Sequence, residues 1–147
     1  MYVDKELLLC DAQAFDADAV STNTIDLGAN SPKNEIGAGE PMCIVVTVDV
    51  AADHTTGNET YQFEILNDAA ADLLTADVIA TFPFTYDQLT AGVVKILPIP
   101  PGSILKRYLG LKHNGGGTTP TITVTAFLTM MSMADALRTY AKGYTIS

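Results

Sequence analysis

The sequence predicts an all-β protein, folded as an antiparallel sandwich or barrel. Several short segments alternate apolar and polar residues with a period of two, which is typical of half-buried strands. Gly, Pro and Asn separate these segments at near-regular intervals. A chain of 147 residues is the size of one domain and is long enough to bury its own core.

The alternation is most regular over 42–50 (MCIVVTVDV) and 121–130 (TITVTAFLTM), where apolar side chains occupy every second position. Pro83 places the strand around it at a sheet edge or a bend, because proline has no N–H to donate. We predict strands over 20–27, 42–50, 61–65, 80–84, 93–97, 104–113 and 121–130.

The segment 96–113 (ILPIPPGSILKRYLGLKH) reads as two strands joined by a rigid corner. Pro98, Pro100 and Pro101 cannot lie in the middle of a paired ladder, and Gly102 supplies the backbone freedom to reverse the chain. This element contains no evident reactive group, so we interpret it as scaffold.

The two ends of the chain are less regular. Residues 1–14 could form a short helix or an extended arm, and we favour the arm; the predicted organisation is an arm over 1–19, a sandwich over 20–130 and a tail over 131–147. Within the tail, Met133, Ala136, Leu137 and Tyr140 have helical spacing, whereas 143–146 look extended. A tail with this many apolar residues must bury them against a surface, either its own sandwich or a neighbouring subunit.

The charge excludes some classes of partner. A net charge of −9, from 17 acids and 8 bases, disfavours nucleic acid, which requires a basic surface. No apolar run approaches the length of a membrane span and no leader pattern is evident, so we expect no membrane partner and synthesis in the cytosol. The low charged fraction, 17%, is consistent with symmetric assembly.

The reactive residues do not form a recognisable catalytic or metal site. His54 and His113 lie far apart in the sequence and each is in or next to a loop, so we expect no metal and no cofactor. Asp49, Asp53, His54 and Glu59 could bind Ca²⁺ weakly, but solvated loop acids are the favoured interpretation. Cys10 and Cys43 form no motif with a histidine, and we expect both to be thiols in a protein that is not an enzyme.

Arg107 is the residue that needs a specific explanation. Arg107 lies two residues from both Leu105 and Leu109, so in a strand all three share the predicted inner face, where a cation requires a partner. We favour an ion pair with an acid at a strand end, such as Asp26 or Asp49, over a contact between subunits.

A set of short motifs resembles those of the capsid cement (decoration) proteins of tailed bacteriophages, of the type found in a Bordetella podophage. The matching motifs, in order, are DAQA at 11–14, STNTIDLG at 21–28, the valine-rich strand at 44–50, LTAG at 89–92, LPIPPG at 97–102, RYL at 107–109 and RTYAKGYTI at 138–146.

The resemblance implies a jelly-roll-type β-sandwich that binds, as a homodimer or homotrimer, to the outer surface of an icosahedral capsid and cements major capsid subunits against internal DNA pressure. It implies a virion protein made in the host bacterial cytoplasm, with no enzymatic activity. The candidate residues for oligomer or capsid contact are Arg107, Tyr108, Leu137, Arg138, Tyr140 and Tyr144.

A different class of function is a carbohydrate- or receptor-binding β-sandwich of a phage fibre. Such a module would expose aromatic side chains on its loops, because sugars stack on aromatic rings. The loops at 30–40, 51–58 and 114–119 contain no Trp, Tyr or Phe, which disfavours this alternative.

Overall fold

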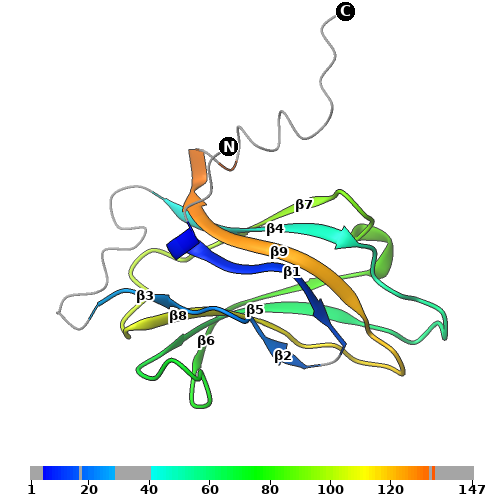
Figure 1. Cartoon of the computed structure of the whole chain (residues 1–147), viewed down its shortest axis with the longest axis horizontal. Coiled ribbons are helices and arrows are strands. Elements are labelled where there is room, and N and C mark those ends of the chain that lie inside the picture. Colours follow the sequence, from blue (N-terminus) through cyan, green and yellow to red (C-terminus); the bar gives the residue numbers. More distant parts are fainter. Residues whose placement is uncertain (1–4, 17, 29–40, 133, 135–147) are drawn as a thin grey trace, which may run out of the picture.

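Two antiparallel β-sheets face each other and enclose the core in the computed structural model, which describes residues 5–16, 18–28, 41–132 and 134. Sheet A contains, in spatial order, β1 (Leu8–Phe15), β9 (Ile122–Met130), β4 (Met42–Val50) and β7 (Val94–Pro98). Sheet B contains β2 (Ala19–Val20), β8 (Tyr108–His113), β5 (Tyr61–Asp68) and β6 (Asp77–Phe84), and β3 (Ile25–Asp26) also pairs with β8. Figure 1 shows sheet A above sheet B.

The order of the strands is that of a jelly roll. Both β2 and β3 pair with β8, so they act as two pieces of one edge strand. With that pair counted once, the order 1-9-4-7 faces the order 2/3-8-5-6, and the chain crosses between the sheets at every connection except β5 to β6. The predicted antiparallel sandwich is confirmed.

The predicted alternation determines which side chains form the core. In β4, Ile44, Val46 and Val48 are buried between the sheets. In β9, Val124 and Ala126 are buried in the same core, while Thr125 between them faces outward. The registers Ile44 with Leu128 and Val46 with Ala126 bring the two apolar series side by side.

The prolines lie where a missing N–H removes no ladder bond. Pro83 and Pro98 belong to β6 and β7, which are edge strands of their sheets. After Pro98 the corner over 99–107 carries the chain from sheet A to sheet B. Ile99 and Ile104 point into the core, and Gly102 adopts φ +72°.

The predicted N-terminal arm is wrong in extent. Residues 8–15 are extended, but they form β1, which pairs with β9 along the edge of sheet A. A 3-10 turn, η1 (Lys5–Leu7), precedes it. Leu9, Cys10 and Phe15 are buried in the main core, so this segment is part of the sandwich and not a separate arm.

The inner face predicted for 104–113 is also wrong in part. The strand begins at Tyr108, and Leu105 is 69% exposed although Leu109 and Leu111 of the same parity are fully buried. The backbone of 105 and 106 donates to the Asn67 side chain instead of pairing with a strand, so the strand starts four residues later than predicted.

Leu105 and Leu111 provide a direct test of the fold. We expect Leu111→Ala to lower the free energy of unfolding by about 2–5 kcal/mol, because it opens a cavity in a fully buried site. Leu105→Ala should change it by less than about 0.5 kcal/mol. Urea unfolding of both variants measures the difference, and equal losses would contradict a strand that begins at Tyr108.

Candidate functional site

The outer face of sheet A carries an apolar cluster that is covered rather than exposed. Cys43 and Val45 of β4 and Phe127 of β9 point away from the main core, yet all three are buried. Partly buried apolar side chains surround them, namely Leu8, Val94, Ile96 and Met131.

The chain that leaves β9 supplies part of this cover. Met131 and Ala134 belong to the cluster, Ala134 is fully buried, and residues 131, 132 and 134 are helical. The Met131 N–H donates to the Pro41 carbonyl at 2.7 Å, which holds the start of this segment beside the start of β4. The C-terminal segment therefore begins on the outer face of sheet A.

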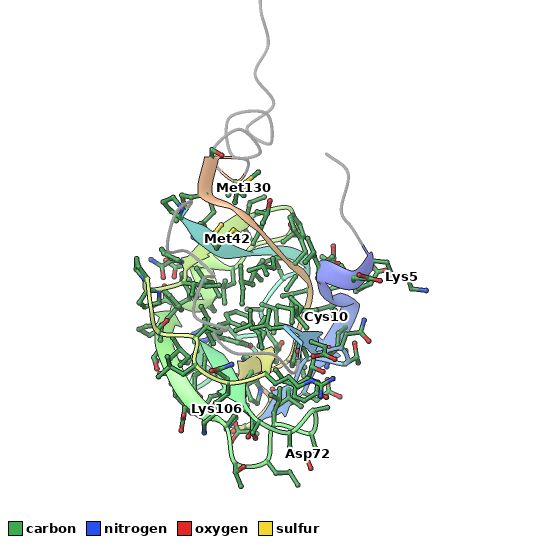
Figure 2. All side chains as sticks on the ribbon, turned by 90° about the vertical axis from the view of Figure 1, so that its left-hand side faces the viewer. Lys5, Cys10, Met42, Asp72, Lys106 and Met130 are labelled. Atoms are coloured by element: carbon green, nitrogen blue, oxygen red, sulfur yellow. The ribbon has the colours of Figure 1, made fainter. Side chains whose placement is uncertain are left out.

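The same end of the sandwich contains the start of β4 and the end of β9. Both lie toward the left in Figure 1, as do the start of β1 and the end of β3. Figure 2 views this end, where Met42 and Met130 lie side by side, consistent with their pairing.

Arg107 lies at this end and pairs with Asp26, one of the two acids predicted for it. Its Nε and Nη2 donate to the two Asp26 carboxylate oxygens at 2.7 and 2.8 Å. The pKa of Arg107 is raised above its ordinary value, mainly by the hydrogen bonds to Asp26. The guanidinium also lies 5.1 Å from the centre of the Tyr108 ring. Both side chains of the ion pair are partly exposed, and the favoured prediction of an ion pair with a strand-end acid is confirmed.

Of the predicted contact residues, the structure therefore brings together Arg107 and Tyr108. Leu137, Arg138, Tyr140 and Tyr144 lie outside the described residues, as does the whole loop at 30–40. The contact role of all six stays a prediction.

Asn67 is a structural residue that sequence reasoning missed. Its buried side chain donates to the carbonyls of Lys106 and Tyr108 and accepts from the N–H groups of Leu105 and Lys106. Nearby, Lys106 Nζ lies 2.9 Å from an Asp77 carboxylate oxygen. The available signal was that Asn67 continues the apolar series of Tyr61, Phe63 and Ile65, so its side chain is expected on the inner face, where a polar group needs partners.

At the opposite end of the sandwich, Glu59 joins two loops and is not the solvated acid that we predicted. Its carboxylate is buried and accepts hydrogen bonds from the N–H groups of Thr56 and Gly57 and from the hydroxyls of Thr56 and Thr119. Asp53 accepts from Thr119 as well, at 2.9 Å. The loops at 51–60 and 114–121 are thereby tied together.

These hydrogen bonds set the ionisation of the two carboxyl groups. Burial raises the pKa of Glu59, but the hydrogen bonds to its carboxylate outweigh burial and hold that pKa below its ordinary value. The pKa of Asp53 is lowered mainly by the hydroxyls of Thr55 and Thr119.

The two histidines lie in different aromatic surroundings. His54 stacks on Tyr86 with ring centres 3.7 Å apart, and its Nδ1 is 3.5 Å from a Glu59 oxygen. His113 is buried among the rings of Phe15, Tyr61 and Phe63. Within the described residues, no three His, Cys, Asp or Glu side chains are close enough together to hold a metal ion.

Both cysteines are buried thiols, as expected. Burial raises the pKa of Cys10 to about 12, so its sulfur stays protonated, and Sγ lies 3.6 Å from the Val124 carbonyl oxygen. A protonated buried thiol is a poor nucleophile.

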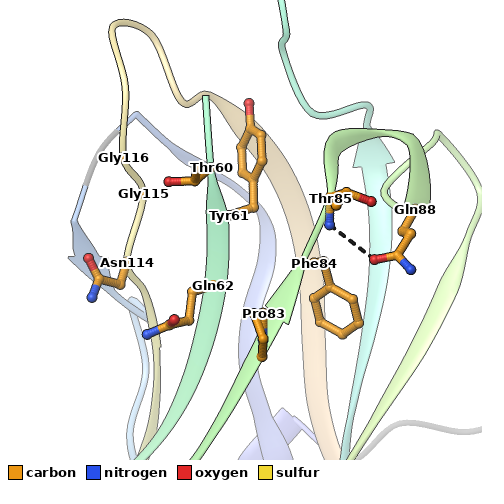
Figure 3. Close-up of a pocket in the computed structure, with 10 residues that line it drawn as sticks. All are labelled: Thr60, Tyr61, Gln62, Pro83, Phe84, Thr85, Gln88, Asn114, Gly115 and Gly116. Atoms are coloured by element: carbon orange, nitrogen blue, oxygen red, sulfur yellow. Dashed lines mark hydrogen bonds between the residues drawn. The ribbon is translucent and has the colours of Figure 1, made fainter. Parts of the chain in front are cut away.

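A groove of about 520 Å³ lies beside the start of β5 and the end of β6 (Figure 3). Its lining is uncharged: Thr60, Tyr61, Gln62, Pro83, Phe84, Thr85, Gln88, Asn114, Gly115 and Gly116. Its two aromatic rings are engaged elsewhere, because the Tyr61 hydroxyl donates to the Asp53 carbonyl and Phe84 packs against Phe63 and Lys95. Tyr61 is also buried, at 2% exposure, and Phe84 is only partly exposed, so the groove offers little aromatic surface to a sugar ring.

Fold and surfaces together define a jelly-roll β-sandwich whose most distinctive feature is a covered apolar outer face. No helix in the described part of the chain is both long and apolar enough to cross a membrane. The family model Bbp16 matches residues 9–130, so the chain belongs to the Bbp16 family, whose name points to a Bordetella phage protein.

Other comparisons add little. No curated protein matches the chain. Among solved structures, a chain from the structure of infectious bursal disease virus Gx strain is similar, with 14% identity, a TM-score of 0.31 and coverage of 82% of this chain and 29% of that one. The match thus spans less than a third of that chain, and at this score it carries no argument.

The Arg107–Asp26 pair gives a prediction about subunit contacts. Because Asp26 of the same chain occupies the guanidinium, we expect Arg107→Leu to lower the melting temperature slightly and to leave the mass in solution unchanged. Light scattering and thermal unfolding measure the two effects. A loss of mass at an unchanged melting temperature would instead assign Arg107 to a subunit interface.

Glu59 gives a prediction about pH. A carboxylate whose pKa is lower in the folded state adds stability above its ordinary value, 4.5 for Glu, and loses that contribution as pH falls through the folded-state pKa. The free energy of unfolding should therefore fall as pH decreases from about 5 to 3, and Glu59→Gln should reduce this dependence. Glu6→Gln, the same change at an exposed position, is the matched control. An unchanged slope in Glu59→Gln would refute the role of this carboxylate.

Proposed function

We propose that this protein is a structural component of a phage virion, which binds the outer surface of the icosahedral capsid and cements major capsid subunits against internal DNA pressure. The observation that carries the proposal is membership of the Bbp16 family over residues 9–130. The motifs at 11–14, 97–102 and 138–146, which resemble those of capsid cement proteins, support the same role.

The physical properties of the chain suit such a role. A clamp must resist deformation, and a sandwich with proline in its edge strands and a closed corner at 99–107 has few internal degrees of freedom. The net charge of −9 keeps the protein from binding packaged DNA. No catalytic activity is part of the proposal.

The partners in this proposal are the major capsid protein and other copies of the same chain, as a homodimer or homotrimer. An oligomer that contacts several shell subunits at once gains affinity through effective concentration, even where each contact is small. We expect the contacts between subunits to depend on the covered apolar face of sheet A, where the C-terminal segment begins.

Capsids that lack the protein provide the test. We expect purified protein to bind them saturably and to raise the temperature at which they release DNA, because added contacts between subunits oppose the internal pressure. Sedimentation with labelled protein measures binding, and DNA release on heating measures reinforcement. Serum albumin, an acidic protein unrelated to phage, controls for adsorption. The proposal fails if the capsids bind no more of this protein than of the control.

A further inference from the structure

The loop that follows β8 begins with a dipeptide that is chemically labile in flexible chains. Asn114–Gly115 is the only Asn–Gly pair in the sequence. In a flexible chain the Gly115 nitrogen can attack Cγ of the Asn114 side chain, because glycine has no Cβ to obstruct the approach. A C–N bond forms, the bond from Cγ to Nδ2 breaks, and ammonia leaves with the proton of the Gly115 N–H. Water then opens the cyclic imide to aspartate or to isoaspartate, in which the main chain runs through Cγ.

Both reacting groups are held by hydrogen bonds in the folded chain. The Gly115 N–H donates to Asp18 Oδ1 at 3.0 Å, and Asn114 Nδ2 donates to Glu64 Oε1 at 3.2 Å. The Asn114 N–H donates to the Gln62 carbonyl at 2.8 Å, which fixes the backbone on the other side of the residue. The attack therefore requires a local opening in which the bond from Gly115 to Asp18 is broken first.

The Asp18 carboxylate also opposes the attack through its charge. The Gly115 nitrogen becomes a nucleophile when it loses its proton, which places a negative charge beside the carboxylate. A like charge nearby disfavours that ionisation, and a hydrogen bond to the N–H favours the protonated form. Asp18 lies between β1 and β2 and is exposed, so its side chain adds nothing to the apolar core.

The packing around Gly115 explains why a labile pair occupies this position. A Cβ at Gly115 would lie 2.7 Å from Cε1 of His113 and 2.9 Å from Cβ of Pro120. Both neighbours are buried, so neither can move aside cheaply. A residue with a side chain would slow the ring closure but would not fit, and protection must come from hydrogen bonds instead.

We propose that Asn114 is a latent deamidation site, which the hydrogen bond from Gly115 to Asp18 keeps intact in the folded protein. Water, the other reactant, has access, because Asn114 and Gly115 are partly exposed and line the groove together with Gln88 of η2 (Tyr86–Gln88) (Figure 3). The inference concerns the chain by itself and does not depend on the proposed function.

Modification would loosen the loop that joins β8 to β9. A carboxylate at position 114 would face Glu64 Oε1, so a hydrogen bond would be replaced by repulsion between two acids. Isoaspartate would also lengthen the main chain beside Gly116, whose N–H and carbonyl pair with Thr60 at 3.0 and 2.9 Å. The product is therefore expected to be less stable than the original chain.

The rate of deamidation in the full-length protein tests the protection. Peptide mapping by mass spectrometry follows the conversion of Asn114 in neutral buffer, below the melting temperature and again in urea. The folded chain should react about tenfold or more slowly than the unfolded chain, because reaction requires local opening. Asp18→Ala should speed the reaction of the folded chain by about threefold to tenfold, as expected for one lost hydrogen bond. Asp16→Ala, the same change at another exposed acid of this segment, is the matched control and should leave the rate unchanged.

Two results would overturn the proposal. One is an equal rate in the folded and the unfolded chain. The other is an Asp18→Ala rate no higher than that of Asp16→Ala; a lower rate would show that the carboxylate removes the Gly115 proton and promotes the reaction. Melting temperatures of both variants confirm that the comparison is made on folded protein.

A mimic of the product tests the consequence. Asn114→Asp should lower the melting temperature by more than Asn114→Ser, which removes the amide without adding a charge. Equal melting temperatures would contradict the repulsion from Glu64.

Discussion

The alternation of side chains along each strand is the constraint on which the rest of this structure depends. Because the sheets must pack their inner faces together, the residues on the two outer faces are determined at the same time. In β4, Ile44 and Val46 point into the core, so Cys43 and Val45 must point outward. The outer face of sheet A is therefore apolar and needs a further segment to cover it. Met131 and Ala134 begin that cover.

This constraint also explains which parts of the fold could be predicted. In β4, β5 and β9 the inward positions carry an apolar residue at every second place over most of the strand, and the structure places these strands close to their expected limits. The strand expected over 104–113 starts late because the Asn67 side chain binds the backbone of 105 and 106. That contact joins residues 38 and 39 positions apart, so local periodicity could not reveal it.

The candidate sites divide in the same way. Arg107 could be matched to Asp26 because a cation beside apolar residues needs an acid at a strand end. Glu59 was expected in solvent because loop acids are commonly solvated, and the hydroxyl that helps bury it comes from Thr119, sixty residues away. The contrast between buried Leu73 and exposed Leu74 leaves no signal in the sequence, since it depends on a left-handed Leu73 packed on Gly110.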